Sequence, residues 1–425
     1  MNWTARNVLI GFLAVLGVLT VAGLIWLWPS GQDLSSKVNK IYDAQNLTHE
    51  SATITDIKDG CDTQQVGQAK CLTATVTINT GEDAGKSVEI ALLGPQAQSG
   101  LKPGDVMEVN RINAGDEPVW SYSSANRLPV LGVLAALFVV VVLAVARWKG
   151  LFALLGLGFA GAVLVGFMLP ALITGKPGIA VALVGGTAIM FVVLYVAHGV
   201  SIRTSTALAG TLLGLAVTAG LGALSAEFAR LSGFAEENEY DLAQLLPGMN
   251  FRELLMVGII VGGLGVLNDV TITQSSAVWE LRAAAPKMSR GKLFAAGMRI
   301  GRDHIASTIY TIVFAYAGGS MAVLLLLYFT DRPATALLNA EMFAGEIVRT
   351  LGSAIGLVLS VPITTGIAAL TVASPERGSV AGVRVVGVDA AFEDGATSSE
   401  GTGGACGAMR SVLSVLTRSP YACTR

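Results

Sequence analysis

The sequence predicts an α-helical polytopic membrane protein with about eight transmembrane helices and a small extracytoplasmic β-barrel domain between the first and second helices. Three observations support this fold class. Hydrophobic residues make up 52% of the 425 residues and charged residues only 14%, whereas soluble domains carry about a quarter charged residues. Long apolar runs alternate with short polar ones, apart from one long polar stretch at residues 30–126. Lysine and arginine gather in alternate loops.

The first apolar run, residues 8–28, is long enough to cross roughly 30 Å of hydrocarbon. Arg6 precedes it, and Trp26 and Trp28 close it, as expected at a membrane interface. A cleaved signal peptide is the alternative, but its apolar region would be only about 7–15 residues long. We therefore expect an uncleaved anchor helix. Further predicted spans are residues 128–146, 151–173, 178–197, 205–224, 254–273, 307–329 and 347–373.

The basic residues predict the orientation, because cytoplasmic loops carry an excess of Lys and Arg. With eight spans, all basic loops fall on the side of the two termini, so both termini are predicted cytoplasmic and residues 30–126 extracytoplasmic. The expected location is the plasma membrane, with the lipid bilayer as the partner. The formal net charge of −2 argues against nucleic-acid binding. The basic residues are Arg6, Arg147, Lys149, Arg203, Arg282, Lys287, Arg290, Lys292, Arg299, Arg302, Arg377 and Arg384.

The polar stretch reads as a β-rich domain, because β-branched residues alternate with period two. The predicted strands are residues 52–57, 72–78, 87–92 and 106–112. Several short strands favour a small closed barrel of the OB-like kind; a small open sheet is the alternative. Cys61 and Cys71 lie in this domain, where disulfides persist outside the cytoplasm. We expect a bridge between them, with two free thiols as the alternative.

The composition changes after Pro375, and residues 395–404 are small and polar, as in a flexible linker. We expect a disordered cytoplasmic tail. The predicted domains are the anchor helix 1–29, the β-rich domain 30–126, a seven-helix membrane domain 127–375 and the tail 376–425.

The sixth span ends in a polar series near the predicted cytoplasmic interface, comprising Asn268, Asp269, Thr271, Thr273 and Gln274. A carboxylate within hydrocarbon is costly and usually faces a bundle interior or a wet cavity. These residues are therefore candidates for an ion, proton or substrate pathway. The alternative is an interfacial Asp269 that pairs with a loop arginine.

The seventh span opens with Asp303, His304 and Ser307. A histidine beside a carboxylate can titrate near neutrality, which suggests a proton relay; an ordinary hydrogen-bonding histidine is the alternative. The sequence holds only three histidines and no Cys/His cluster with metal spacing, so no metal site is predicted. It contains no Walker loop, GxSxG, HExxH or Rossmann fingerprint, so no cofactor is expected.

In the eighth span, Pro362 removes a backbone donor and predicts a helix break. Such breaks persist in membranes only where protein or water satisfies the backbone. Residues 265–273 and 356–364 share a similar pattern of Gly, Val, Ile and Thr. The pattern fits a parallel repeat, which would point to a transporter site, or a chance similarity.

Three segments carry a family resemblance: residues 265–282, residues 301–308 (Gly-Arg-Asp-His-Ile-Ala-Ser-Thr) and residues 361–365 (Val-Pro-Ile-Thr-Thr). They resemble the YibE/F-like family of multipass bacterial membrane proteins. The resemblance covers most of residues 30–375 and implies an integral plasma-membrane protein, with no established activity. The family typically shows a doubled Asp where this chain has Asn268-Asp269.

Three functional hypotheses follow. The first is a secondary transporter or ion-conducting protein whose pathway uses the polar residues of spans six and seven. The second is a non-catalytic membrane scaffold or accessory subunit that binds a protein partner through the outer β domain. The third is a membrane enzyme of envelope metabolism, for which Asp303, His304 and Ser307 are the only nucleophile–base candidates.

Overall fold

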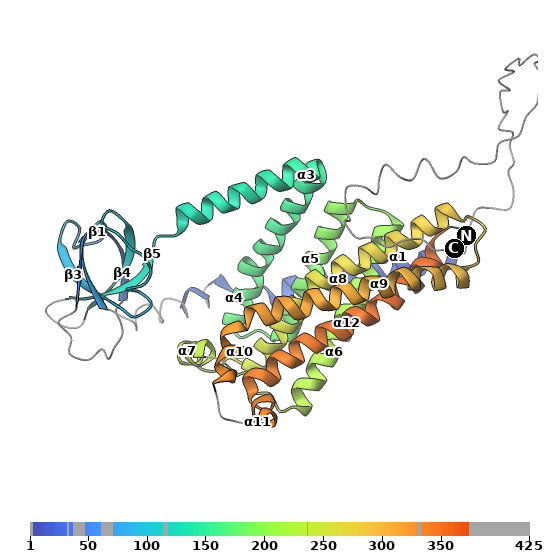
Figure 1. Cartoon of the computed structure of the whole chain (residues 1–425). Coiled ribbons are helices and arrows are strands. Elements are labelled where there is room, and N and C mark those ends of the chain that lie inside the picture. Colours follow the sequence, from blue (N-terminus) through green and yellow to red (C-terminus); the bar gives the residue numbers. More distant parts are fainter. Residues whose placement is uncertain are drawn as a thin grey trace, which may run out of the picture. The chain divides into compact units, whose positions relative to one another are not determined.

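The computed structural model describes residues 3–31, 34–36, 47–60, 71–113, 118–235, 237–329 and 333–373. The chain divides into two compact units, Met1–Pro375 and Glu376–Arg425. The second unit lies outside the described residues, so the predicted tail stays a prediction. The first unit contains a five-stranded sheet and a set of long helices (Figure 1).

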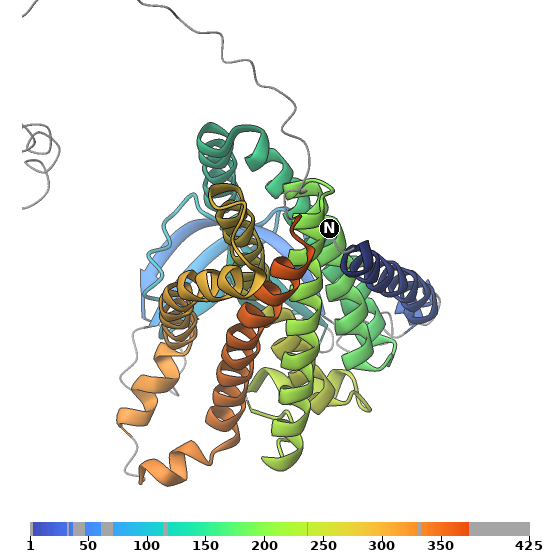
Figure 2. The ribbon, with the colours of Figure 1, turned by 90° about the vertical axis from the view of Figure 1, so that its right-hand side faces the viewer.

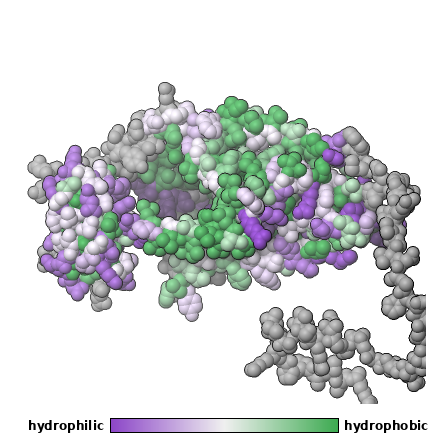
Figure 3. Space-filling view, turned by 90° about the horizontal axis from the view of Figure 1, so that it is seen from above, coloured by the Kyte–Doolittle hydropathy of each residue, from purple (hydrophilic) through white to green (hydrophobic). Residues whose placement is uncertain are grey.

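Within the described residues, six helical stretches are long and apolar enough to cross a membrane. This agrees with the prediction of a multipass membrane protein. The helical part and the sheet domain also differ in surface hydropathy. Green apolar atoms cover much of the helical part, whereas the sheet domain is mostly white and purple (Figure 3). In chain order the six are α1 (Trp3–Leu27), the continuous α3–η1–α4 stretch (Leu128–Ile173), α5 (Gly178–His198), α6 (Ile202–Phe228), α8 (Phe251–Ala284) and α12 (Glu341–Thr371).

The α3–η1–α4 stretch contains a sharp turn inside α3 (Leu128–Val163), visible in Figure 1. The stretch has 46 residues, and at about 1.5 Å per residue it would be about 69 Å long if straight, more than twice the roughly 30 Å of a bilayer core. Arg147 interrupts it with φ 52° and ψ −131°. This turn lies between the predicted spans 128–146 and 151–173.

The predicted span 307–329 is divided in the structure. Its first part lies in α9 (Arg290–Gly319) and the rest in α10 (Met321–Tyr328), with Ser320 between them. Neither helix is among the six apolar ones, because α9 is rich in charge over its first half and α10 is short. Two more short helices complete the described chain, α7 (Glu237–Leu245) and α11 (Ala334–Leu338).

Polar side chains cap the helix starts and so fix where several helices begin. The Ser201 side chain accepts a hydrogen bond from the Thr204 N–H at the start of α6, at 3.1 Å. Asn250 caps α8 in the same way, accepting from the Glu253 N–H at 3.2 Å. These caps satisfy N–H groups that a helix leaves unpaired in its first turn.

The centre of the helical bundle consists of α6, α8 and α12, each packed against the other two. Figure 2 shows α12 beside α6, with α9 on one side of this pair and α1 on the other. The α9 helix packs on α12 and α8, whereas α1 packs mainly on α5. The shared core includes fully buried apolar side chains such as Leu208, Ile260, Leu267 and Leu357.

The β domain is a curled antiparallel sheet with the strand order β3-β2-β1-β4-β5. The edge strands β3 and β5 also approach each other, so the sheet forms a half-barrel. Inward side chains such as Ile54, Val76, Ile90 and Met107 are almost fully buried. The strands are β1 (Leu47–Asp59), β2 (Cys71–Ile78), β3 (Ser87–Leu93), β4 (Val106–Asn113) and β5 (Pro118–Ala125).

The first four strands overlap the predicted ones, whereas β5 was not predicted from the sequence. The strand begins with Pro118, a residue tolerated at the first position of a strand or on an edge. Trp120 and Tyr122 pack against the sheet core from alternate positions of β5. This alternation of aromatic residues was the sequence signal for the strand. Cys71 begins β2 and is disulfide-bonded. Cys61 lies outside the described residues, so its pairing with Cys71 stays a prediction.

Candidate functional site

The predicted site residues on α8 fall on two different faces of the helix. Thr271 is fully buried, and its Oγ1 lies 2.6 Å from Thr211 Oγ1 on α6. Asn268 is half-buried, and its Oδ1 has no hydrogen-bond partner among the described residues. Asp269 and Thr273 are exposed instead. The structure therefore brings Asn268 and Thr271 into or near the bundle interior and leaves the carboxylate outside it.

On α9, Asp303 and Ser307 are exposed and His304 is half-buried. The Ser307 hydroxyl donates to the main-chain carbonyl of His304 at 3.0 Å. The His304 Nε2 is buried and has no partner among the described residues. The serine is thus bonded to the backbone of His304 and not to its ring, so these three residues do not form an aligned nucleophile–base pair.

A larger set of buried and half-buried polar side chains lies on one face of α12. These residues recur at intervals of three, four or seven positions, which is the spacing of one helix face. From the first to the last, 25 residues apart in the chain, the helix rises about 38 Å, so the set is long enough to cross a bilayer core of roughly 30 Å. We call it the polar stripe of α12: Glu346, Arg349, Ser353, Ser360, Thr364 and Thr371.

Helix α6 lies close against this stripe. The hydroxyls of Thr206 and Thr371 are 3.1 Å apart. A Cβ at Gly356 of α12 would collide with the Thr218 hydroxyl, and a Cβ at Gly210 of α6 would collide with the Thr364 hydroxyl. Glycine at these positions therefore allows the two backbones to approach each other, as small residues do in membrane bundles.

Gln274 of α8 joins three helices next to the stripe. This side chain is almost fully buried. Its Nε2 donates to the Gly297 carbonyl of α9 at 2.8 Å and to Thr365 Oγ1 of α12 at 2.7 Å. Helix α12 continues through Pro362 without a break, and Thr365 and Ser360 bond back to carbonyls of their own helix.

At the other end of the stripe lies a charged pair. Arg349 Nη1 and Glu346 Oε2 are 3.2 Å apart. The Arg349 Nε is buried without a partner among the described residues. Tyr316 of α9 approaches the same region of α8, because a Cβ at Gly262 would lie 3.0 Å from its hydroxyl. A guanidinium, a carboxylate and a phenol thus converge where α8, α9 and α12 meet.

Two pockets open beside this pair, and Glu346 lines both. One has a volume of about 300 Å³ and lies between α9, α10 and α12, with Tyr316 in its wall. The other has about 90 Å³ and lies between α8 and α12, with Arg349 and Glu341 in its wall. Glu346 was missed in the sequence because the predicted eighth span began at residue 347, whereas Arg349 lay inside that span and was not singled out. The sequence signal that could have identified them is a Glu-x-x-Arg pair early in an apolar helix, where ionisable residues are rare.

The comparison with protein families gives the context of this site. The model of the YibE/F-like protein family matches residues 134–374, more than half of the chain. The chain belongs to the YibE/F-like family. Comparisons with curated proteins and with solved structures gave no match.

In this YibE/F-like protein, the matched region contains the entire polar stripe of α12 and its partners on α6, α8 and α9. Helix α1 and the β domain lie outside the matched region. The part of the chain that the family shares is therefore the part that buries polar side chains between helices.

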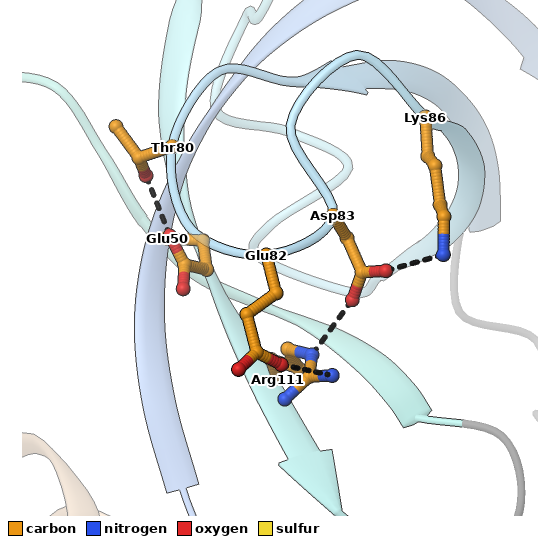
Figure 4. A network of polar contacts seen from close by, with 6 residues as sticks. All are labelled: Glu50, Thr80, Glu82, Asp83, Lys86 and Arg111. Carbon is orange, nitrogen blue, oxygen red and sulfur yellow. Dashed lines mark hydrogen bonds and ion pairs between the residues drawn. The ribbon is translucent and has the colours of Figure 1, made fainter.

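The β domain of the YibE/F-like protein has its own charged network, drawn in Figure 4. Asp83, in the turn between β2 and β3, is almost buried and pairs with Lys86 and with Arg111 Nε, the latter at 2.8 Å. The hydrogen bonds from Lys86 and then Arg111 hold the pKa of the Asp83 carboxyl below its ordinary value. Thr80 donates to Glu50 at 2.6 Å. These contacts tie the turn to β1 and β4.

Proposed function

We propose that this YibE/F-like protein is a multi-pass plasma-membrane secondary transporter or ion-conducting protein whose pathway follows the polar stripe of α12. One observation carries the proposal: the stripe runs for about the thickness of a bilayer and ends in a Glu346–Arg349 pair beside two pockets. Ionisable groups within membrane spans are costly, and they mark ion or substrate pathways in most proteins that keep them.

Helix packing alone accounts for only part of the stripe. Serine, threonine and glycine are common at helix contacts in membranes because they allow close approach and hydrogen bonding. That role explains Ser360, Thr364 and Gly356. It does not require a carboxylate and a guanidinium farther along the same face, where even partial burial costs free energy. Glu346 and Arg349 therefore favour a pathway.

We assign the predicted residues on α8 and α9 to the part of the proposed pathway that lies outside the polar stripe of α12. Asn268 and Thr271 continue the buried polar surface from α12 to α8. Asp269 and Asp303 lie at similar distances from the short loop that joins α8 to α9, and both are exposed. We propose that these carboxylates, with Thr273, His304 and Ser307, belong to the half of the pathway nearer that loop.

The proposed topology has eight spans, cytoplasmic termini and an extracytoplasmic, OB-like β domain. The turn at Arg147 supports two separate spans in place of one long helix. The strand order, with β1 central and β3 near β5, supports the OB-like assignment. Sidedness follows from the distribution of arginine and lysine.

The test is ion flux through the full-length protein in proteoliposomes. H⁺, Na⁺, K⁺ and Cl⁻ fluxes would be measured with fluorescent indicators under an imposed membrane potential. We expect a flux above that of protein-free liposomes, reduced at least about tenfold, equivalent to ~1.4 kcal/mol in the barrier, by Arg349→Gln and by the double variant Ser360→Ala/Thr364→Val.

The matched control is Thr20→Val in α1. Thr20 is a buried threonine that bonds to its own helix, at the Leu16 carbonyl, and lies away from the stripe. Flux should be unchanged in this variant. Equal flux in the wild type and both stripe variants, with all proteins folded, would remove the stripe from the mechanism.

A further inference from the structure

An apolar groove runs beside α1 on the side that faces α6 and α12. It has a volume of about 450 Å³. Among the described residues, the only charged one in its wall is Arg290, the first residue of α9. The apolar lining residues are Ala5, Val8, Leu9 and Phe12 of α1, Ala209 and Leu213 of α6, and Ile367 and Leu370 of α12.

The other polar residue in the wall is already satisfied. The Thr371 hydroxyl bonds to the Ile367 carbonyl at 2.7 Å and lies 3.1 Å from the Thr206 hydroxyl. The Arg290 guanidinium, in contrast, makes no hydrogen bond or ion pair with any described residue. The groove therefore combines an apolar body with one cation whose hydrogen-bonding capacity is unused by the described part of the chain.

The groove is short enough to lie within one leaflet. On α1 the lining extends from Ala5 to Phe12, which is about 10 Å along a helix, whereas half of a bilayer core is about 15 Å. A partner transmembrane helix would need a groove about three times as long, to cross roughly 30 Å. An acyl chain extends through only one leaflet from a headgroup at the membrane surface, so a groove of this length can hold much of it.

The end of the bundle that holds Arg290 is also electropositive. Arg282, at the end of α8, is almost fully buried, and its Nη1 donates to the Pro286 and Met288 carbonyls. Its Nε and Nη2 have no partner among the described residues. Basic pockets between transmembrane helices bind the headgroups of anionic lipids.

We infer that this groove is a binding site for an anionic phospholipid. The phosphate binds the Arg290 guanidinium through charge-assisted hydrogen bonds, and one acyl chain lies along α1, α6 and α12. The lipid fills the space between α1 and the central bundle, and so attaches a helix that otherwise contacts the bundle mainly through α5. The inference is independent of the proposed transport activity.

Native mass spectrometry of the full-length protein, released from detergent and titrated with lipid, tests this site. The probes are phosphatidylglycerol and phosphatidylcholine with the same acyl chains. We expect phosphatidylglycerol to bind at least about tenfold more tightly, a difference of ~1.4 kcal/mol. Arg290→Gln should lower the affinity for phosphatidylglycerol to that for phosphatidylcholine.

Arg299→Gln is the matched control, because Arg299 is an exposed arginine on the same helix and outside the groove. It should leave both affinities unchanged. Val8→Trp, at an exposed position of the groove wall, should weaken both lipids while the protein remains folded. Equal losses in Arg290→Gln and Arg299→Gln would show non-specific attraction and overturn the inference. Competition by inorganic phosphate at the same concentration as the lipid would show a free phosphate site, which also overturns it.

Discussion

Replacing Gly356 by alanine should destabilise the helical bundle, because α6 and α12 touch at this position. A Cβ on Gly356 would collide with Thr218 Oγ1 and would lie 3.1 Å from Thr218 Cβ. Thr218 cannot easily rotate away, since its hydroxyl donates to the Gly214 carbonyl at 3.0 Å. Overpacking of this kind costs about 1–3 kcal/mol, and we expect the free energy of unfolding to fall by that amount.

The matched control is Gly352→Ala, one turn earlier on α12. A Cβ at Gly352 meets no atom within 4 Å. Alanine is also the better helix former, by about 0.5–1 kcal/mol, so this variant should be as stable as the wild type or slightly more stable.

The assay is reversible unfolding of the full-length protein in mixed detergent–SDS micelles, followed by far-UV circular dichroism. The double variant Gly356→Ala/Thr218→Ala removes the colliding hydroxyl and should recover part of the loss. If Gly356→Ala were as stable as Gly352→Ala, the close contact between α6 and α12 would be refuted.

Three further predictions concern other contacts. Gln274→Leu removes two hydrogen bonds between helices and should lower the free energy of unfolding in the same assay by about 1–2 kcal/mol. Asp83→Asn should weaken hydrogen-exchange protection of the β domain at neutral pH. Because the folded pKa of Asp83 lies below 3.8, the wild type keeps this contribution above that pH and loses it as the pH falls through the folded pKa, whereas the variant shows no such loss. Gly81→Ala should reduce protection of β1 and β2 more than Gly85→Ala. Both glycines have positive φ, but only at Gly81 would a Cβ collide with Glu50.

The sequence predicted the membrane class and the β-rich domain because both depend on local patterns. Apolar runs of sufficient length need only a bilayer to be stable, and period-two alternation needs only one buried face. The number of helices was harder to predict. The region of span seven is charged early and divided at Ser320, and the turn at Arg147 shows in the sequence only as a short basic interruption.

The candidate site was predicted only in part, because polarity along a chain does not show which way a side chain faces. Asp269 and Thr271 are two residues apart on one helix, so they point in different directions, and only Thr271 is buried. The polar stripe of α12 consists mainly of serine and threonine, which are frequent in membrane helices. Their burial depends on the neighbouring helices, above all on the approach of α6 at Gly210.

The most direct test of the proposed pathway is the water accessibility of Ser360, in the middle of the polar stripe. Ser360→Cys in proteoliposomes would be treated with a membrane-impermeant methanethiosulfonate reagent, and the modified peptide would be quantified by mass spectrometry. Ala182→Cys, in the fully buried apolar core of α5, is the control. Modification of Ser360→Cys but not of Ala182→Cys is the predicted result. If both cysteines stay unmodified in folded protein, the stripe is a packing surface and not a pathway.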